Sequence, residues 1–342
     1  MIIVEQPEDQ ELEEILQSLK TKIKIVGCGG AGSNTVSRIM EDGIQDVELI
    51  AMNTDAAHLY MIRAQKKVLL GRRITGGLGA GAIPEIGMKS ALESEEDIKK
   101  VLDGSDIVFI TAGMGGGTGT GSAHIVAKIA KELGALTVAV VTFPFSAEGK
   151  YRFENAVWGL EKLLENADSV IIIMNDKLLK LVPRMPLNKA FKVADEILER
   201  AIKGISEMIT KPGLINLDYN DLKTVMKESG LAMIGLGESD SEKRAEIATM
   251  NAINSPLVDI DISEAKGAIV DVIGGEDMTV EEAHKAVQIV ETKMDKNARI
   301  IWGATIRPDF RRKMGVMVVV TGIKGKPEYK FTESGIKLDI VK

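Results

Sequence analysis

Three glycine-rich runs carry the clearest chemical signal in this chain of 342 residues. They lie at 27–32, 71–87 and 113–121, each directly after a short apolar segment. Glycine loses much backbone entropy on folding, so a cluster needs a reason, such as a tight turn or a ligand that approaches the backbone. Free backbone N–H groups at such turns and at helix starts hold phosphate oxygens. The runs therefore indicate tight turns, close approach of the backbone to a ligand, or both.

The first run, Gly27 to Gly32, fits Gly-x-Gly-x-x-Gly between an expected strand and an expected helix, and Asp55 follows the next strand. This arrangement is typical of a dinucleotide site, where the start of the helix holds the pyrophosphate. Close packing of strand against helix without a ligand would explain the same glycines. Taken alone, the run leaves both interpretations open.

The third run, GMGGGTGTGS from Gly113 to Ser122, favours a nucleoside triphosphate over a dinucleotide. Seven successive small residues, 115–121, leave amides free to wrap an anion, and Thr118, Thr120 and Ser122 add hydroxyl groups for phosphate oxygens. A dinucleotide does not need a second phosphate cradle, whereas a nucleoside triphosphate would use both. The Gly-Lys-Ser/Thr ending of a P-loop is absent from this run.

The elements that must position these loops alternate along the chain. Strands are expected at 22–27, 47–53, 68–71, 106–113, 135–143 and 169–175, and helices at 32–42, 88–102, 122–133 and 149–166. This alternation predicts an α/β fold with a Rossmann-like, mostly parallel sheet that helices cover on both faces. The glycine runs all follow strands, so they lie at the one sheet edge where ligands bind.

The remaining chain predicts a second unit. A long helix at 187–210 ends before the breaker Lys211-Pro212-Gly213. A smaller α+β domain with a mixed sheet follows, with helices near 218–229, 241–254 and 279–295 and strands near 266–274, 298–305 and 315–322. The predicted divisions are an N-terminal helical arm (1–20), a nucleotide-binding domain (21–185), a connecting helix (186–210), a second domain (211–322) and a short tail (323–342).

Composition narrows the function classes. Hydrophobic residues make up 45% and charged residues 27%, as in soluble globular proteins. The net charge of −7 is unlike the positive charge of a protein that binds nucleic acid non-specifically. Cys28 is the single cysteine and the three histidines are scattered, so no metal-ligand spacing is present. No apolar run approaches the roughly 20 residues of a membrane span, and the acidic N-terminus is unlike a signal peptide, so we expect a cytoplasmic protein.

The decamer GMGGGTGTGS resembles the signature of the tubulin/FtsZ superfamily, and its Gly-Thr-Gly-Thr-Gly form is similar to the FtsZ branch rather than to tubulin. The resemblance covers about residues 22–320, and the short tail and acidic arm look archaeal. Other segments match in order: IKIVGCGGAGSNTVSRI, GLGAGAIPEIG, FPFSAEGKYR, IIIMNDKLL and GLINLDYNDLKTVMKESGLAMIGLG.

The resemblance implies a GTP site made of the following residues. The first loop would contact the phosphates and the guanosine through Gly29, Gly30, Ala31, Gly32, Ser33 and Asn34. The signature loop would cradle the phosphates with Gly115, Gly116, Gly117, Thr118, Gly119, Thr120 and Gly121. Glu148 and Arg152 would lie near the ribose and phosphates, while Asn175 and Asp195 would read the guanine. GTP or GDP and Mg²⁺ are the implied cofactors, with Mg²⁺ on the phosphates and no direct side-chain ligand.

The resemblance also assigns Asn216, Asp218 and Asp221 to catalysis. On spacing alone, Asp218 and Asp221 share one face of a helix start and are ordinary partners of the helix dipole. In the family, the matching acids enter the site of the next subunit and polarise the attacking water. The glycine loops offer no evident base, so acids from a neighbour would complete the site. The implied protein is a GTPase activated by self-assembly, whose head-to-tail contact generates filaments.

The implied role is a filament at the mid-cell division site. Its expected partners are further copies of the chain and division-site tether or regulator proteins, with no nucleic acid and only indirect membrane contact. Two other classes stay open, an NAD-dependent oxidoreductase and a non-hydrolysing filament scaffold. The first leaves the third glycine run unexplained, and intact Asp218 and Asp221 argue against the second. The segment from Gly335 to Lys342 fits either a docking peptide or a last edge strand.

Overall fold

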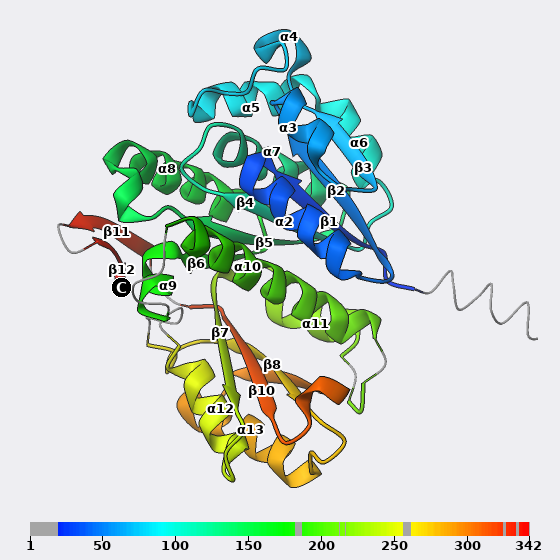
Figure 1. Ribbon diagram of the computed structural model, residues 1–342, viewed down its shortest axis with the longest axis vertical. Coiled ribbons are helices and arrows are strands. Elements are labelled where there is room, and N and C mark those ends of the chain that lie inside the picture. Colours follow the sequence, from blue (N-terminus) through cyan, green and yellow to red (C-terminus); the bar gives the residue numbers. More distant parts are fainter. Residues whose placement is uncertain are drawn as a thin grey trace, which may run out of the picture.

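Six parallel strands form the sheet in the upper half of the molecule (Figure 1). Their order across the sheet is β3 (Lys66–Leu69), β2 (Val47–Asn53), β1 (Ile23–Cys28), β4 (Ile107–Gly113), β5 (Leu136–Phe143) and β6 (Ser169–Met174). The residues of β1, β5 and β6 are all buried, which explains why these strands read as continuous apolar runs. The predicted α/β fold with a mostly parallel sheet is confirmed.

The structure is a computed structural model. It describes residues 20–181, 187–211, 213–215, 217–255, 261–323, 326–332 and 335–341. The arm predicted at 1–20 lies outside these ranges except for its last residue. Within the described ranges, no helix has the length and apolar character needed to cross a membrane.

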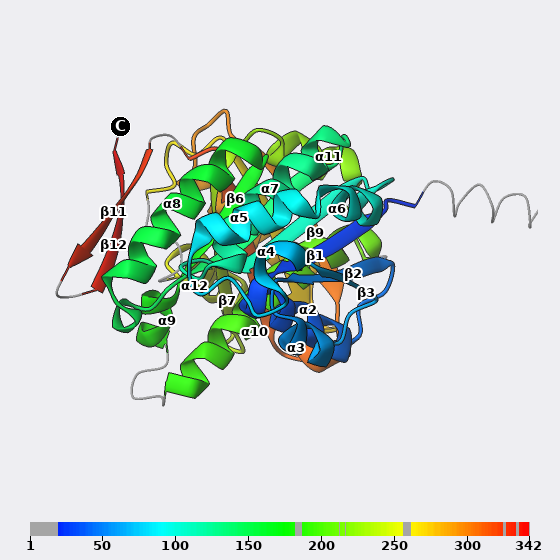
Figure 2. The ribbon, with the colours of Figure 1, turned by 90° about the horizontal axis from the view of Figure 1, so that it is seen from above.

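Helices cover both faces of this sheet (Figure 2). One face carries α2 (Gly29–Asp42), α3 (Ala56–Met61) and α10 (Leu187–Thr210); the other carries α5 (Pro84–Glu93), α6 (Glu95–Leu102), α7 (Thr118–Glu132) and α8 (Lys150–Asn166). The short helices α4 (Arg72–Thr75) and α9 (Asn175–Leu181) follow β3 and β6. A separate apolar cluster fills the space on each face of the sheet.

Several predicted boundaries on this side were wrong. Helix α2 begins at Gly29 rather than at residue 32, and β3 spans Lys66–Leu69 rather than 68–71. The run 71–87 is not all loop, because it contains α4 and the first turn of α5, where Pro84 occupies a position that needs no N–H donor. The single helix expected at 88–102 is two helices that meet at Ser94. Helix α7 begins at Thr118 rather than at residue 122. Two of its glycines lie inside the helix at close contacts, Gly119 against the ends of β1 and β4 and Gly121 against α5.

A second sheet continues from the first. Three residues at the start of β7 (Gly230–Ser239) pair in parallel with β6, and the rest of β7 pairs antiparallel with β10 (Met314–Thr321). Beyond β10 lie β8 (Gly267–Gly274) and β9 (Arg299–Ile306). The mixed character of this sheet was predicted, but β7 was not, because its glycines weaken a strand signal and its burial comes from tertiary contacts.

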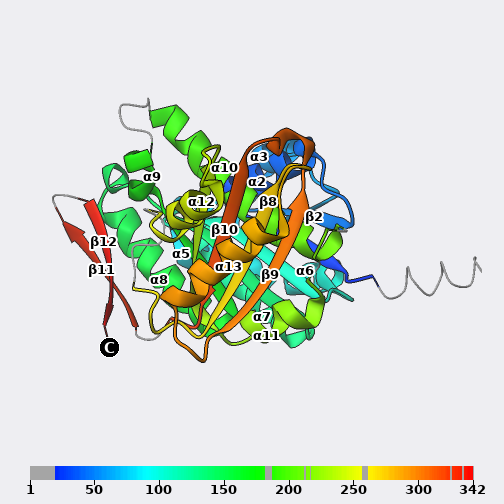
Figure 3. The same cartoon turned by 90° about the horizontal axis from the view of Figure 1, so that it is seen from below.

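Helices α12 (Arg244–Ile253) and α13 (Val280–Lys293) cover the outer face of the second sheet (Figure 3), and α11 (Tyr219–Met226) lies between the two units. The inner face of the second sheet packs against α10. On α10, Ala201, Ile202 and Ile205 are fully buried in one cluster with Ile171 of β6 and Val319 of β10. Each buried isoleucine contributes about 1.5–3 kcal/mol, so α10 binds both sheets together.

The chain ends in a hairpin of β11 (Lys326–Thr332) and β12 (Gly335–Val341). The Tyr329 ring stacks on the Phe143 ring at the end of β5, with 5.1 Å between the ring centroids. Of the two interpretations of the segment from residue 335, the strand is the one the structure adopts.

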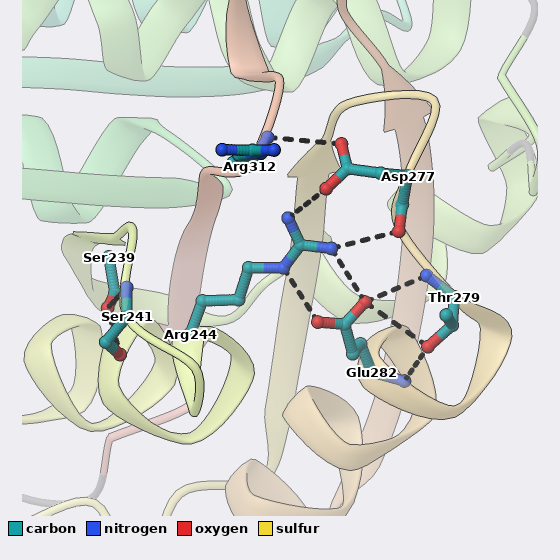
Figure 4. A network of polar contacts seen from close by, with 7 residues as sticks. All are labelled: Ser239, Ser241, Arg244, Asp277, Thr279, Glu282 and Arg312. Carbon is teal, nitrogen blue, oxygen red and sulfur yellow. Dashed lines mark hydrogen bonds and ion pairs between the residues drawn. The ribbon is translucent and has the colours of Figure 1, made fainter.

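An arginine network ties α12 to α13 (Figure 4). The guanidinium of Arg244 donates to both Glu282 carboxylate oxygens, at 2.7 and 2.9 Å, and to Asp277 Oδ2 at 2.6 Å. The hydrogen bonds from Arg244 hold the pKa values of Glu282 and Asp277 below their ordinary range. These contacts therefore stabilise the fold above the ordinary carboxyl pKa, and the contribution is lost as the pH falls through the lowered values.

Replacing Arg244 tests this network. We expect Arg244→Met to lower the free energy of unfolding by about 2 kcal/mol, the scale of hydrogen bonds to a charged group. Arg312→Met is the control, because Arg312 contributes only its backbone N–H to Asp277. Urea unfolding followed by circular dichroism measures both variants, and equal midpoints for Arg244→Met and the parent chain would contradict the assignment.

Candidate functional site

Two of the glycine runs meet backbone to backbone at the carboxyl ends of β1 and β4. Gly29 has a φ of +72°, and a Cβ placed on it would lie 2.6 Å from the Gly119 nitrogen. A Cβ on Gly32 would lie 2.2 Å from the Thr111 oxygen of β4. No side chain fits at either place. Gly29 and Gly32 therefore allow the close packing of strand against helix, which was one of the two interpretations of the first run.

Other members of the loops have room beside them. Gly30, Ala31 and Asn34 are exposed at the first turns of α2. A Cβ on Gly116 would meet no atom within 4 Å. The amino ends of α2 and α7 thus lie side by side, and both present N–H groups that no helix bond uses. An anion is stabilised at such a place by the N–H groups and the helix dipoles.

The hydroxyl groups of the signature loop are used mostly inside the loop. Thr120 is fully buried and accepts the Gly115 N–H at 2.9 Å, and Ser122 donates to the Thr118 carbonyl at 2.7 Å. Thr118 is half-buried, and its hydroxyl lies 2.6 Å from that of Thr54 at the end of β2. The hydroxyl groups that were expected to face phosphate therefore hold the loop in its conformation instead. Contacts between the loop's backbone N–H groups and a phosphate stay a prediction.

A turn after β5 places Glu148 and Arg152 beside the signature loop. Glu148 Oε1 accepts the Phe145 N–H at 2.9 Å, and its Oε2 lies 3.0 Å from the Arg152 guanidinium. A Cβ on Gly115, with φ of +101°, would lie 2.9 Å from the Arg152 carbonyl oxygen. The predicted pair thus lies together at the same edge of the sheet, with the Arg152 side chain exposed.

The two predicted guanine readers stand on adjacent helices, α9 and α10. Asn175 is 5% exposed, and its Oδ1 has no hydrogen-bond partner among the described residues. An unpaired buried amide oxygen costs free energy that a ligand N–H would recover. Asp195 Oδ2 lies 3.3 Å from an Arg38 nitrogen of α2. Burial raises the Asp195 pKa, and the Arg38 charge opposes that rise.

Asp218 and Asp221 lie at the opposite ends of the strands, where β1 and β4 begin. Asp218 caps α11 by accepting the Asp221 N–H at 2.8 Å, and both side chains are exposed. Asp218 shares a surface hollow with Lys22 and Asp106, which stand just before β1 and β4. A six-residue strand is roughly 20 Å long, so the acids of one chain do not reach its own glycine loops. Asn216, the third predicted catalytic residue, lies outside the described residues.

Comparison with protein families decides between the candidate nucleotides. Residues 22–183 match the family model described as "Tubulin/FtsZ family, GTPase domain", and residues 230–324 match "FtsZ family, C-terminal domain". The chain belongs to the tubulin/FtsZ family. The glycine loops of this FtsZ-family chain are therefore those of a GTPase domain, and an NAD-dependent oxidoreductase is not favoured.

Similar proteins cover nearly the whole chain. "Cell division protein FtsZ 1" of Archaeoglobus fulgidus is 55% identical over 92% of this chain and 86% of its own length; the protein of the same name from Methanocaldococcus jannaschii is 54% identical over 97% and 90%. A solved structure, "FtsZ dimer, empty (M. jannaschii)", covers 99% of this chain and 98% of its own, with a TM-score of 0.91 and 53% identity. CetZ2 from Haloferax volcanii, at 21% identity and a TM-score of 0.77, shares the fold.

The sequence did not single out Thr54 and His58, two polar residues of this FtsZ-family chain that lie beside the glycine loops. Thr54 is fully buried against Thr118, and His58 stands on α3 beside Gly30. The signal available was their place directly after β2, in the stretch Asn-Thr-Asp-Ala-Ala-His. A strand end in such a sheet is where binding residues gather.

Two glycines of the signature loop separate packing from binding. A Cβ on Gly121 would lie 2.0 Å from the Pro84 oxygen of α5, whereas a Cβ on Gly116 has open space. We expect Gly121→Ala to destabilise the fold by about 1–3 kcal/mol, because α5 and α7 must move apart. Gly116→Ala leaves the unfolding midpoint unchanged and weakens GTP binding, because the new methyl group stands over the open loop.

Thermal unfolding without nucleotide and titration with a fluorescent GTP analogue measure the two effects. His284→Ala, on the exposed surface of α13, is a control for binding. A Gly121→Ala variant as stable as the parent chain would show that the helices are not locked at this contact.

Proposed function

We propose that this chain hydrolyses GTP at a site shared by two subunits and assembles head to tail into filaments that act in cell division. The observation that carries the proposal is the separation of Asp218 and Asp221 from the glycine loops by the full length of the strands. A site that needs both parts forms only where the acidic edge of one subunit meets the phosphate edge of the next. Such a contact repeats without closing and produces a filament.

Each edge then has its own chemistry. The loops of Gly29 to Asn34 and Gly115 to Gly121 bind the phosphates through backbone N–H groups, with Glu148 and Arg152 beside them. Asn175 and Asp195 read the guanine, because an amide oxygen and a carboxylate accept the N–H groups that adenine lacks at those positions. The neighbour's Asp218 and Asp221, with Asn216, orient and polarise the attacking water, since phosphoryl transfer needs positioning and charge stabilisation more than covalent chemistry.

Mg²⁺ belongs on the nucleotide in this proposal. Among the described residues, no group of three or more His, Cys, Asp or Glu side chains is arranged to hold a metal ion. The phosphate oxygens of the nucleotide would be its main ligands, and the bound ion would supply charge neutralisation during phosphoryl transfer. The chain contributes the two helix starts and the loop backbone around them.

The names of the archaeal relatives, which are cell division proteins, support a role in cell division. We propose a mid-cell, cytoplasmic location, with tether and regulator proteins that dock near the C-terminal hairpin. In this scheme residues 21–185 bind GTP, 186–210 connect the two edges and 211–322 carry the activating acids.

Changing Asp218 tests the shared site. We expect Asp218→Ala to bind GTP as the parent chain does and to form filaments, but to release phosphate at least about a hundredfold more slowly. Because Asp218 also caps α11, Asp218→Asn is the matched variant: asparagine is an equally good cap but carries no charge. We expect Asp218→Asn to lose turnover as Asp218→Ala does. Phosphate release, light scattering and GTP binding are measured together, and full turnover by Asp218→Asn would refute the assigned role.

Dilution tests whether hydrolysis needs a neighbour. Turnover per molecule should rise steeply above a critical protein concentration, because only assembled subunits have a complete site. Mixing Asp218→Asn subunits, which lack the acid, with Gly116→Ala subunits, which bind GTP weakly, should restore some turnover. A specific activity that does not change with dilution would indicate a self-contained monomeric GTPase.

A further inference from the structure

Arg38 joins the helix that follows the first glycine loop to the helix that carries Asp195. It stands on α2, one turn after Asn34, and its side chain is half-buried. Its Nη1 donates to the Lys192 carbonyl oxygen at 3.2 Å, and its Nη2 lies 3.3 Å from Asp195 Oδ2. Both partners belong to one turn of α10, so a single guanidinium group holds this turn against α2 at two points.

The other carboxylate oxygen of Asp195 stays available. None of the described residues donates a hydrogen bond to Oδ1, and the side chain is 20% exposed. An ionised carboxylate has about four acceptor positions, so Asp195 can hold Arg38 on Oδ2 and still accept two further N–H groups. Guanine offers N1–H and a 2-amino group on one edge, whereas hypoxanthine offers N1–H alone. The two bases therefore differ in how many acceptors they need from Asp195.

The surroundings of Asp195 disfavour its ionised form, except for Arg38. Burial raises the pKa of Asp195, the charge of Arg38 opposes that rise, and the charge of Glu196 on the same helix adds to it. These are the charged groups that act on Asp195 within the described part of the chain. A protonated carboxyl group has an O–H donor in place of one acceptor. Arg38 thus favours the form in which both oxygens accept.

We propose that Arg38 is a positioning residue for base recognition: it orients the Asp195 carboxylate with both oxygens accepting, and so sets the preference for guanine over hypoxanthine nucleotides. The inference rests on the proposed GTP site, in which Asp195 reads the base, and deepens it. Because α2 begins at the first glycine loop, the same contact fixes the base reader relative to the turn that would hold the phosphates.

Removing the guanidinium group tests this role. Arg38→Met keeps a long side chain without charge. We expect it to lower the preference for GDP over IDP by about tenfold, because a hydrogen bond between the 2-amino group and a charged acceptor is lost. A loss of packing alone would weaken both nucleotides equally. Arg200→Met is the matched control, since Arg200 also lies on α10 but pairs with Glu238 of β7.

The pH dependence of GDP binding separates charge from packing. Without Arg38 the pKa of Asp195 rises further, so on acidification the affinity of Arg38→Met should fall at a higher pH than that of the parent chain. Burial and the neighbouring Asp42 raise the pKa of Glu199, one turn along α10, to about 7. Both pH profiles are therefore measured with Glu199→Gln in each chain, which removes that titration.

Dissociation constants for GDP and IDP are measured by displacement of a fluorescent guanine nucleotide, at protein concentrations too low for assembly. Thermal unfolding without nucleotide shows whether each variant is folded, and Arg38→Gln, an uncharged donor, takes the place of Arg38→Met if the latter is not. An unchanged preference for GDP over IDP, or a pH profile equal to that of the parent chain, would overturn the inference. An equal loss of preference in Arg200→Met would also overturn it. A parent chain that does not bind GDP would instead refute the proposed function itself.

Discussion

The first and third glycine loops follow the adjacent parallel strands β1 and β4, and their backbones touch where these strands end. The contact between Gly29 and Gly119 leaves no room for a side chain, and Gly32 is held against β4 in the same way. These contacts bring the starts of α2 and α7 together, so two sets of free N–H groups face one place. The other residues of the proposed nucleotide site, Glu148, Arg152, Asn175 and Asp195, are arranged around this backbone contact.

The central helix α10 links the side of the glycine loops to the opposite ends of the strands. It carries Asp195, which is ion-paired with α2, and it is buried between the two sheets along its apolar stripe. Its C-terminal end leads through the segment before α11 to Asp218. One helix therefore connects the side that would read the base in the proposed site with the side that carries the acids, and β7 joins the sheets beside it.

Much of this organisation could be predicted from the sequence, because buried parallel strands are continuous apolar runs and each glycine run follows one. The positions of the loops, the length of α10 and the mixed second sheet followed from those patterns. The sequence could not tell which glycines pack and which stay open, since Gly121 and Gly116 differ only in what lies next to them in space. For the same reason it could not predict β7, or that Thr120 and Ser122 bond within their own loop.

The placement of acids and loops at opposite edges makes the two tips of any filament unequal. In the proposed assembly, n subunits contain n minus one complete sites, so a dimer works at half capacity and a long filament near full capacity. One terminal subunit always holds a nucleotide that no neighbour attacks, while the other offers acids that meet no nucleotide. The first tip therefore keeps GTP after the interior has hydrolysed it. The polarity of such a filament, and a triphosphate cap at one end, would follow from the length of a six-residue strand.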